Sequence, residues 1–343
     1  MKHIYKRGET ETEAILAYSM PGSNEYILAT PSVIKPVNND LEDFDFIFAP
    51  FDSTQHSTLG IKISSYASSR KFVCHPEGYL PSHQTSRDEY TEQYASAKEI
   101  IRSGQLDKIV LSKVKHIQKE VKDIFPLFIR MKNTYVSAFS FLLSIPGWGT
   151  WVGASPELVL REANDIVCTR AIAGTRSTLQ DDIEWSEKEV QEHRFIETYL
   201  KDTLSRQEIL FDISDSYTIS AGPVSHICSD ITIESSRNNL AELIDIIHPG
   251  PALSGMPKQL SIGIIRDIES HDREYYCGYL GLFDKQNGAD LYATIRCMQV
   301  YEDGYRLYLG GGITSGSKLE SEWDETEFKA ETLMSIINMD DGV

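Results

Sequence analysis

Hydrophobic residues follow two different periods along this chain, so both helices and strands are predicted. Residues 88–104 place apolar side chains at helical spacing and end near a glycine, which predicts a helix. The apolar run that follows, residues 107–117, predicts a buried strand with Lys108 near its start. A long acidic segment, residues 182–206, predicts a second helix.

Further short apolar runs predict strands, and three more segments predict helices. The strand-like runs are residues 14–20, 25–30, 44–51, 138–145, 148–155, 158–163, 165–174, 217–227, 290–300 and 306–317. The additional helices are residues 238–247, residues 257–268 and a segment that opens at Glu320.

The order of these elements indicates the fold class. Strands and helices are interleaved without strict alternation, and no repeat, low-complexity linker or change of composition divides the chain. We therefore expect a single α+β domain over residues 1–343, built from antiparallel sheets covered by helices. Within it, residues 1–85 carry no assignable motif, whereas residues 88–340 carry the candidate chemistry.

Composition excludes several classes of function. The formal charge of −18 argues against nucleic acid or an anionic membrane surface as a partner, because both would be repelled. No apolar run approaches the roughly 18 residues of a membrane span, and the first residues lack the apolar core of a signal peptide. The five cysteines are scattered without a CxxC spacing, so neither disulfides nor zinc are indicated. We expect a cytoplasmic protein.

The C-terminal third contains a candidate anion site. Arg296 falls in an alternating pattern with Thr294 and Met298, so we expect it on one face of a strand, where its guanidinium could meet a planar carboxylate. The glycine run 310–312 is expected to let backbone N–H groups approach a ligand that a Cβ atom would block.

Two pairs of glutamates are candidates for a metal site. Glu322 and Glu325 are three residues apart on a predicted helix, as are Glu189 and Glu192, so each pair shares a helix face. Magnesium usually takes one or two protein carboxylates and keeps water and substrate oxygens, so we expect two direct ligands and two acting through water. Either pair alone is better explained as a solvated helix face. Together with Arg296 and the glycine run, the metal site is favoured.

Lys108 and Glu157 are candidates for acid–base chemistry. Lys108 shares a strand face with Val110, and partial desolvation would make its ammonium lose a proton more readily, as a general base requires. Glu157 follows a proline at a strand start, and an apolar setting would raise its pKa into the range of a general acid. Taken alone, a solvated lysine and an ordinary turn residue remain the alternatives.

Other motifs are absent or point to structural roles. The chain has no HExxH, GxSxG or Walker sequence, and residues 310–317 lack the ending of a phosphate loop. His193 is expected on a helix surface. His248 lies in a segment interrupted by Pro249 and Pro251, which favours a turn.

These motifs together resemble the chorismate-utilising enzymes, the family of isochorismate, salicylate, anthranilate and aminodeoxychorismate synthases. The resemblance rests on KIVLSK from Lys108, GASPEL, AIAGTR, SEKEVQEH, HPGPALSGMPK, DREYYCGYLG, TIRC, GGGI and EWDET, in the family's order. It covers about residues 88–340, and the first 85 residues match only loosely.

The resemblance implies a ligand set. Magnesium would bridge the C1 carboxylate of chorismate to Glu192 and Glu325, with Glu189 and Glu322 acting through water. Arg296 and the backbone near Gly311 and Gly312 would hold the pyruvyl carboxylate. The other residues that the resemblance implies for the substrate site are Gly174, Thr175, His248, Ala252, Leu253, Tyr276 and Lys329.

The nucleophile distinguishes the members of the family. The similarity implies isochorismate synthase, with Lys108 deprotonating water at C2 and Glu157 protonating the departing C4 hydroxyl. Relatives that add ammonia typically have glutamine at the first position, and aminodeoxychorismate synthases often have a nucleophilic lysine where Ala173 stands. Those activities are therefore less favoured.

Salicylate synthases share the lysine and the glutamate and remain the near rival. Ala252 resembles the pure synthases, whereas Tyr276 also occurs in lyases. A non-catalytic chorismate-binding subunit is a third reading. If water is the nucleophile, no glutamine amidotransferase partner is expected, and we expect a monomer. Menaquinone and siderophore synthesis both stay open as the destination of isochorismate.

Overall fold

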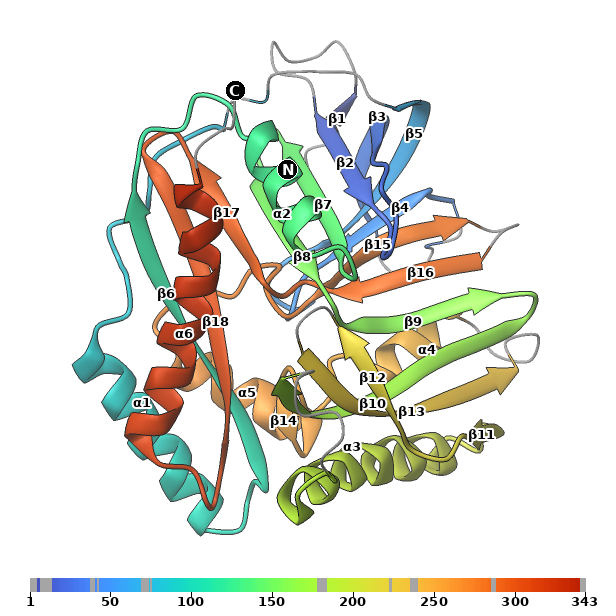
Figure 1. The fold of residues 1–343 in the computed structure, drawn as a ribbon, viewed down its shortest axis with the longest axis vertical. Coiled ribbons are helices and arrows are strands. Elements are labelled where there is room, and N and C mark those ends of the chain that lie inside the picture. Colours follow the sequence, from blue (N-terminus) through green and yellow to red (C-terminus); the bar gives the residue numbers. More distant parts are fainter. Residues whose placement is uncertain are drawn as a thin grey trace.

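The computed structural model describes residues 5–6, 14–37, 41, 43–68, 74, 76–177, 184–221, 224–234, 240–284 and 288–339. Figure 1 shows the arrangement of the helices and strands in these ranges. The helices are α1 (Arg87–Arg102), α2 (Phe125–Thr134), α3 (Glu187–Arg206), α4 (Leu240–Ile247), α5 (Lys258–Ile268) and α6 (Leu319–Asn338).

The strands fall into two halves of the sequence. Those in the first half are β1 (Tyr5–Lys6), β2 (Ile15–Ser19), β3 (Ile27–Val37), β4 (Phe46–Ala49), β5 (Thr58–Ser68), β6 (Lys108–Gln118), β7 (Phe139–Ile145), β8 (Gly149–Ser155) and β9 (Leu158–Ala163). Those in the second half are β10 (Ile166–Ser177), β11 (Phe211–Ile213), β12 (Tyr217–Ala221), β13 (Val224–Glu234), β14 (Gly255–Met256), β15 (Tyr279–Asp284), β16 (Gly288–Ala293), β17 (Cys297–Tyr301) and β18 (Gly304–Thr314).

The described strands pair only in antiparallel fashion, along one continuous path. From β14 the hydrogen-bonded order is β6, β18, β17, β8, β7, β2, β3, β5, β4, β15, β16, β9, β10, β13 and β12. The two longest partners in the site region, β6 and β18, run in register from Lys108 opposite Thr314 to Gln118 opposite Gly304. This architecture confirms the predicted α+β class with antiparallel sheets covered by helices.

Aromatic side chains join two parts of the sheet that are far apart along this path. Tyr18 of β2 lies 6.2 Å, between ring centroids, from Phe46 of β4, and Phe139 of β7 stacks on Tyr292 of β16 at 4.5 Å. All four are almost fully buried. The burial of these large rings holds the β2–β7 region against the β4–β15–β16 region, and each pair adds a geometry-specific contribution of roughly 1 kcal/mol.

A second hydrophobic cluster lies under α2 and α6. Phe128 of α2 and Leu333 of α6 pack in the same cluster as Leu142, Val152 and Leu307 of the sheet. The helix α6 lies over β18 (Figure 1), and its apolar residues belong to this cluster, whereas Glu322, Glu325 and Lys329 line the cavity described below.

Two of the predicted helices begin at a capping box, which fixes where each helix starts. Ser86 and Glu89 form one at α1, and Ser186 and Glu189 form another at α3. Each serine accepts a hydrogen bond from the backbone N–H of its glutamate, and each glutamate accepts one from the serine N–H. The predicted start of the second helix, residues 182–183, lies outside the described residues.

The sequence analysis was wrong about several elements, among them the unpredicted strand β5, the helix α2 and the region of β12 and β13. Residues 125–134 form α2, which was not predicted, because a ten-residue apolar segment with aromatic residues is ambiguous between helix and strand. The single strand predicted at 217–227 is instead two paired strands, β12 and β13. The Gly222-Pro223 dipeptide between them is a turn signal that was overlooked.

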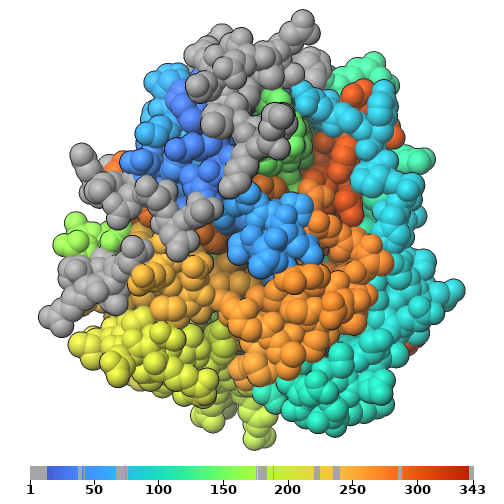
Figure 2. Space-filling model, turned by 180° about the vertical axis from the view of Figure 1, so that it is seen from behind, coloured from blue at the N-terminus to red at the C-terminus, as the bar shows by residue number. Residues whose placement is uncertain are grey.

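None of the helices in the described ranges is long and apolar enough to cross a membrane. The space-filling view in Figure 2 shows the side opposite to Figure 1, where segments from the first and last thirds of the chain lie next to each other. Among the described residues of the first 85, β2 pairs with β7 and β4 pairs with β15, so these strands belong to the same sheet as the later ones.

Candidate active site

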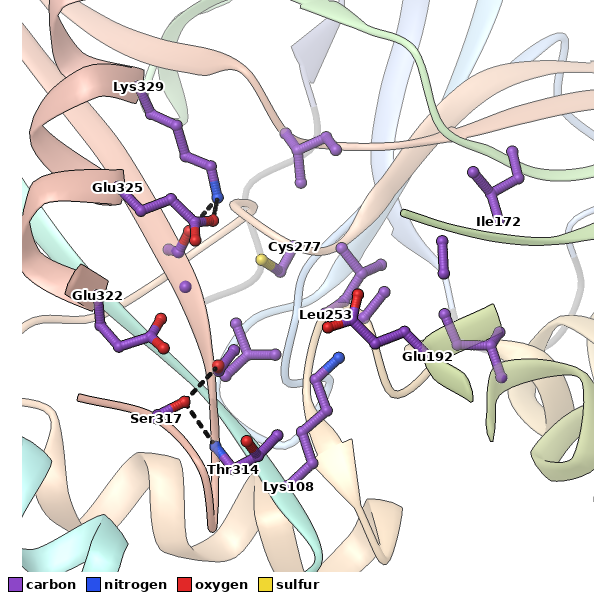
Figure 3. Close-up of a pocket in the computed structure, with 18 of the residues that line it drawn as sticks. Lys108, Ile172, Glu192, Leu253, Cys277, Thr314, Ser317, Glu322, Glu325 and Lys329 are labelled. Carbon is purple, nitrogen blue, oxygen red and sulfur yellow. Dashed lines mark hydrogen bonds and ion pairs between the residues drawn. The ribbon is translucent and has the colours of Figure 1, made fainter. Parts of the chain in front are cut away.

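A cavity of about 1080 Å³ lies where β6, β18 and α6 face α3 and β10. Figure 3 shows its lining, with Glu322, Glu325 and Lys329 on the α6 side and Glu192 across from them. The residues that line it carry both signs of charge, and the cations Arg296, Lys318 and Lys329 are among them. The cavity therefore suits an anionic ligand, provided that the negative charges of the glutamates in its lining are neutralised.

Lys108 is the first residue of β6, and its side chain reaches into this cavity (Figure 3). Burial lowers the pKa of its ammonium, while the negative charges of Glu192, Glu157 and Glu325 oppose that shift. In Figure 3 the amino group of Lys108 and the carboxylate of Glu192 point toward one another. Burial therefore moves the pKa of Lys108 toward the neutral amine that a general base requires, whereas the neighbouring carboxylates favour the charged form.

The glycine run makes room for side chains that enter the cavity. A Cβ atom on Gly312 would lie 2.9 Å from Cε of Lys108, and one on Gly310 would lie 2.7 Å from the hydroxyl of Tyr276. Gly311 points the other way, where a Cβ would lie 3.5 Å from a carboxylate oxygen of Glu322. A side chain at 310 or 312 would therefore force Tyr276 or Lys108 to shift, a reason for glycine that the sequence analysis did not foresee.

Glu157 stands at the corner between β8 and β9. Its backbone carbonyl accepts a hydrogen bond from Ala293 N at 2.9 Å, which fixes the corner to the end of β16. Burial raises the pKa of the Glu157 carboxyl to about 7, and the charge of Lys108 opposes that shift. Half-buried and facing the cavity, this carboxyl can hold a proton near neutral pH and donate it.

A smaller chamber of about 290 Å³ adjoins the main cavity behind Glu157. His248 lines this chamber and not the main cavity, so it is separated from the predicted substrate-binding residues that line the main cavity. Its Nε2 is buried and has no hydrogen-bond partner among the described residues. Burial lowers the pKa of His248 to about 3, so the ring is neutral.

Three of the four predicted metal-binding glutamates line the cavity. Glu322 and Glu325 come from α6 and Glu192 from α3. Glu325 also accepts a hydrogen bond at 2.7 Å from Lys329, which donates a second one to the Gly310 carbonyl at 2.8 Å.

Glu189 does not line the cavity. Its carboxylate accepts hydrogen bonds from the N–H and hydroxyl of Ser186, at 2.9 and 2.7 Å, in the capping box of α3. Glu189 thus acts as the cap of α3 in this structure, and its predicted role at the metal through water stays a prediction.

The three carboxylates of the lining bear on whether the cavity can hold magnesium. In the described part of the chain, no three His, Cys, Asp or Glu side chains are close enough together to hold a metal ion by themselves. Oxygen donors nevertheless match a hard cation, and Mg²⁺ ordinarily takes one or two carboxylates plus substrate oxygens and water. The lining fits an ion that a substrate carboxylate helps to hold.

The prediction that Arg296 sits in an alternating strand is wrong. The strand pattern ends at Ala293 and resumes at Cys297, and Arg296 lies in the kink between them with a φ of 48°. The backbone leaves the ladder there because Thr294 N bonds to the Gly278 carbonyl, while Ala154 N bonds to the Arg296 carbonyl. Left-handed backbone is unfavourable for arginine, and such residues concentrate at functional sites. The side chain still lines the cavity.

The other predicted substrate-binding residues are mostly brought together. Gly174, with a φ of 67°, Ala252, Leu253 and Tyr276 line the main cavity. The side chain of Thr175 lies outside the described part of the structure. His193, expected on a helix surface, is instead buried at 2% exposure beside Ser229, because α3 packs that face on β13.

Sequence reasoning missed several residues of the lining, among them Phe195 and His226. Phe195 lies three positions after Glu192 on α3, so the spacing on one helix face was a usable signal. His226 enters the cavity from β13, and its Nδ1 lies 2.7 Å from the Gly174 carbonyl. Its position depends on the pairing of β13 with β10, which no local pattern shows.

The fold and this cavity together define an enzyme of the chorismate-utilising type. The family model for chorismate binding enzymes matches residues 65–335, and the chain belongs to this family. The match confirms the resemblance and begins about twenty residues earlier than the motifs.

Known proteins agree with this assignment. The chain is 28% identical over 312 residues to isochorismate synthase EntC of Escherichia coli (strain K12), covering 84% of this chain and 80% of that protein. It is also 28% identical over 264 residues to anthranilate synthase component 1 3 of Haloarcula marismortui, covering 73% of this chain and 52% of that protein.

Solved structures share the fold. A putative 2,3-dihydroxybenzoate-specific isochorismate synthase, DhbC, from Bacillus anthracis superposes with a TM-score of 0.78 at 23% identity, covering 97% of this chain and 98% of the other. At this level of identity the likeness establishes the fold and leaves the reaction to be argued from the site.

Proposed function

We propose that the protein is a magnesium-dependent isochorismate synthase, which converts chorismate reversibly into isochorismate. The observation that carries the proposal is the pair formed by Lys108 and Glu157. Both face one cavity, and their pKa values are shifted in the directions that a neutral base and a protonated acid require. An enzyme that adds water needs such a base, whereas one that adds ammonia does not.

The reaction exchanges one hydroxyl group for another. Lys108 takes a proton from a water molecule as its oxygen bonds to C2 of chorismate. The ring double bonds shift, the bond from C4 to its hydroxyl oxygen breaks, and Glu157 supplies the proton with which that hydroxyl leaves as water. One water is consumed and one is released, so substrate and product are isomers. Each group can act in the opposite sense for the reverse reaction.

The remaining charged residues bind and orient the substrate. Arg296 has a planar guanidinium that suits a carboxylate in a bidentate contact, and Lys329 offers a second cation. Glu192 and Glu325 would hold magnesium, with Glu322 nearby. When bound, the ion would neutralise the ring carboxylate among the acidic side chains. Without that neutralisation a carboxylate would be repelled by the three glutamates.

Salicylate synthase is the second candidate, and one observation favours it. Tyr276 is buried and lines the cavity, at the position where lyases of the family also have tyrosine. A salicylate synthase would form isochorismate and then eliminate pyruvate from it. We also propose that the enzyme acts as a cytoplasmic monomer without a glutamine amidotransferase subunit, and menaquinone and siderophore synthesis both remain open as destinations.

Product analysis separates these functions. Purified protein is incubated with chorismate and magnesium, with and without ammonium chloride, and the products are resolved by chromatography. Isochorismate in equilibrium with chorismate is expected, and ammonium should change nothing. Salicylate with pyruvate would replace the first function by the second. An aminated product would contradict water as the nucleophile, and tight binding without turnover would indicate a non-catalytic subunit.

A further inference from the structure

A buried ion pair lies directly behind the wall of the cavity that carries Lys108. The side chains of Glu269 and Arg273 are only 2% and 3% exposed. Arg273 donates from Nε and Nη2 to the two carboxylate oxygens of Glu269, at 2.8 and 2.6 Å. Removing two charges from water is costly, and such a pair is weak evidence for stability by itself. Its retention suggests a task that an apolar pair would not perform.

The contacts of Arg273 beyond Glu269 point to that task. Nη2 donates to the carbonyl of Val110 at 2.7 Å, and Nη1 donates to the carbonyl of Leu253 at 3.1 Å. Val110 and Leu253 both line the cavity, although they are far apart in the sequence. One planar guanidinium therefore links two walls of the cavity through their backbones. A lysine, with one nitrogen, cannot reproduce this fork of donors.

Glu269 fixes the same strand at a second residue, Ser112. Its Oε1 accepts a hydrogen bond from Ser112 N at 2.7 Å, and its Oε2 accepts one from the Ser112 hydroxyl at 3.0 Å. Ser112 and Val110 belong to β6, which begins at Lys108. The pair thus holds the strand of the base at two residues, Val110 and Ser112.

The segment 253–256 is joined to the start of the same strand. Val110 N donates to the Ser254 carbonyl at 2.8 Å. Met256 and Gly255 of β14 pair with Lys108 and Ile109 of β6. Arg273 continues this connection by taking the Val110 and Leu253 carbonyls. The Arg273 carbonyl also accepts a hydrogen bond at 2.8 Å from the N–H of Tyr276, whose ring lines the cavity.

We propose that Arg273, held by Glu269, is a positioning residue that sets the spacing between the Lys108 strand and the Leu253 segment. It touches neither substrate nor reacting atoms in this account. It acts by fixing where the amine of Lys108 stands relative to the ring of the substrate lying against Leu253. Displacement of a reacting group by about 1 Å can cost on the order of a hundredfold in rate, so loosening this link lowers turnover more than binding.

This inference rests on the proposed function, because turnover of chorismate is the quantity that it predicts. The test compares Arg273→Lys with Arg266→Lys. Arg266 also lies on the α5 side and binds a carboxylate, Asp52, through Nε and Nη2, but it does not line the active-site cavity. Circular dichroism and thermal unfolding first establish the temperature range in which each variant is folded, and kinetics are measured within it.

The expected result is a fall in kcat of about 10- to 100-fold for folded Arg273→Lys, with KM within about threefold of wild type. Arg266→Lys should keep the wild-type kcat. A purely structural pair would lower the melting temperature and leave kcat of the folded fraction unchanged. Folded Arg273→Lys with wild-type kcat would therefore overturn the proposal, and so would an equal loss in Arg266→Lys.

A rescue experiment gives a readout that a structural role would not produce. Arg273, Glu269 and His271 also line a cavity of about 240 Å³ on the other side of the pair. Guanidinium ion at millimolar concentration should enter there and raise kcat of Arg273→Ala in a saturable manner, while leaving Lys108→Ala inactive. Absence of rescue in a folded Arg273→Ala variant would contradict the proposal.

A milder substitution covers the case in which neither Arg273 variant folds. Ser112→Ala removes the hydroxyl that donates to Glu269 and lies 2.9 Å from Nε2 of His271, but it keeps the hydrogen bond from Ser112 N to Glu269. The same pattern of lower kcat and steady KM is expected at smaller size, about two- to fivefold. Unchanged kcat would count against the proposal. Inactive wild-type protein would instead refute the proposed function itself, so the two failures are distinguishable.

Discussion

Lys108 and Glu157 face one cavity, yet their protonation is controlled differently. Burial lowers the pKa of Lys108, and the carboxylates of Glu192, Glu157 and Glu325 oppose that shift. Burial raises the pKa of Glu157 to about 7, and only the charge of Lys108 opposes it. The pKa of Lys108 therefore depends on a balance between burial and several nearby charges, whereas the pKa of Glu157 depends mainly on its removal from water. Changes in the surrounding charges should move the lysine more than the glutamate.

This difference has a consequence for the pH dependence of the rate. The reactive form holds a neutral Lys108 and a protonated Glu157, so the rate falls when the lysine gains a proton at low pH and when the glutamate loses one at high pH. The profile should be bell-shaped, with apparent pKa values that belong to the pair. Substitutions at and around Lys108 and Glu157 should affect the base and the acid to different degrees.

Removal of the base should have the largest effect. Lys108→Ala is expected to lower the rate of isochorismate formation by about 10³-fold, because no other described group occupies the position of the amine. Binding of chorismate in the presence of magnesium, measured by calorimetry, should persist, since the anion and metal groups remain. Full activity of this variant would refute the assignment of Lys108.

Moving the base without removing it should have the next largest effect. In Gly312→Ala the new Cβ would lie 2.9 Å from Cε of Lys108, so the lysine side chain must shift. We expect kcat to fall about 10- to 100-fold with a smaller change in KM. Gly263→Ala on α5 is the control, since a Cβ there meets no atom within 4 Å, and it should behave as wild type. Equal activities of the two variants would show that the lysine tolerates displacement.

Glu325→Gln tests the balance of charges around the base. Loss of one hard ligand should raise the magnesium concentration for half-maximal rate by about tenfold, measured by titration. The lost negative charge no longer raises the pKa of Lys108, so the low-pH limb should move to lower pH while the high-pH limb stays.

Glu189→Gln serves as the comparison for this metal titration. Glu189 caps α3, and glutamine can also fill a capping box, so a much smaller change is expected. Identical magnesium titrations for Glu325→Gln and wild type would argue against Glu325 as a ligand.

The smallest expected effect is the change in the free energy of unfolding when the acid, Glu157, is replaced. In the folded state the pKa of Glu157 is raised from 4.5 to about 7, so its protonated form favours folding at low pH, and this contribution is lost as pH rises from 4.5 through 7. Glu157→Gln should therefore gain stability relative to wild type between pH 5 and pH 8. Because Glu157 is half-buried, we expect a gain of about 1–2 kcal/mol in denaturant unfolding. A difference independent of pH would contradict the raised pKa.

The sequence predicted the fold class and most of the residues that meet in the cavity. Lys108 was recognisable because Val110 shares its face on an apolar strand, and the structure gives the lowered pKa that this pattern indicates. Glu322 and Glu325 could be placed on one face because helical spacing is local. Such periodic patterns survive folding wherever the element stays regular.

The parts that sequence reasoning missed depend on contacts between distant segments. Arg296 leaves its strand because the backbone around it bonds to β8 and to Gly278, and Glu189 is drawn into a capping box with Ser186. The link from Arg273 to Val110 and Leu253 joins segments more than a hundred residues apart. Local periodicity contains no information on these partners.

The source of the new oxygen atom tests the central claim most directly. Chorismate is converted by the wild-type protein in water enriched in oxygen-18, with magnesium present, and the isochorismate is examined by mass spectrometry at early times. Water activated by Lys108 should place one labelled oxygen in the hydroxyl at C2. Isochorismate without label would mean that the hydroxyl moves within the substrate, and neither Lys108 as base nor Glu157 as acid could then have the role assigned to it.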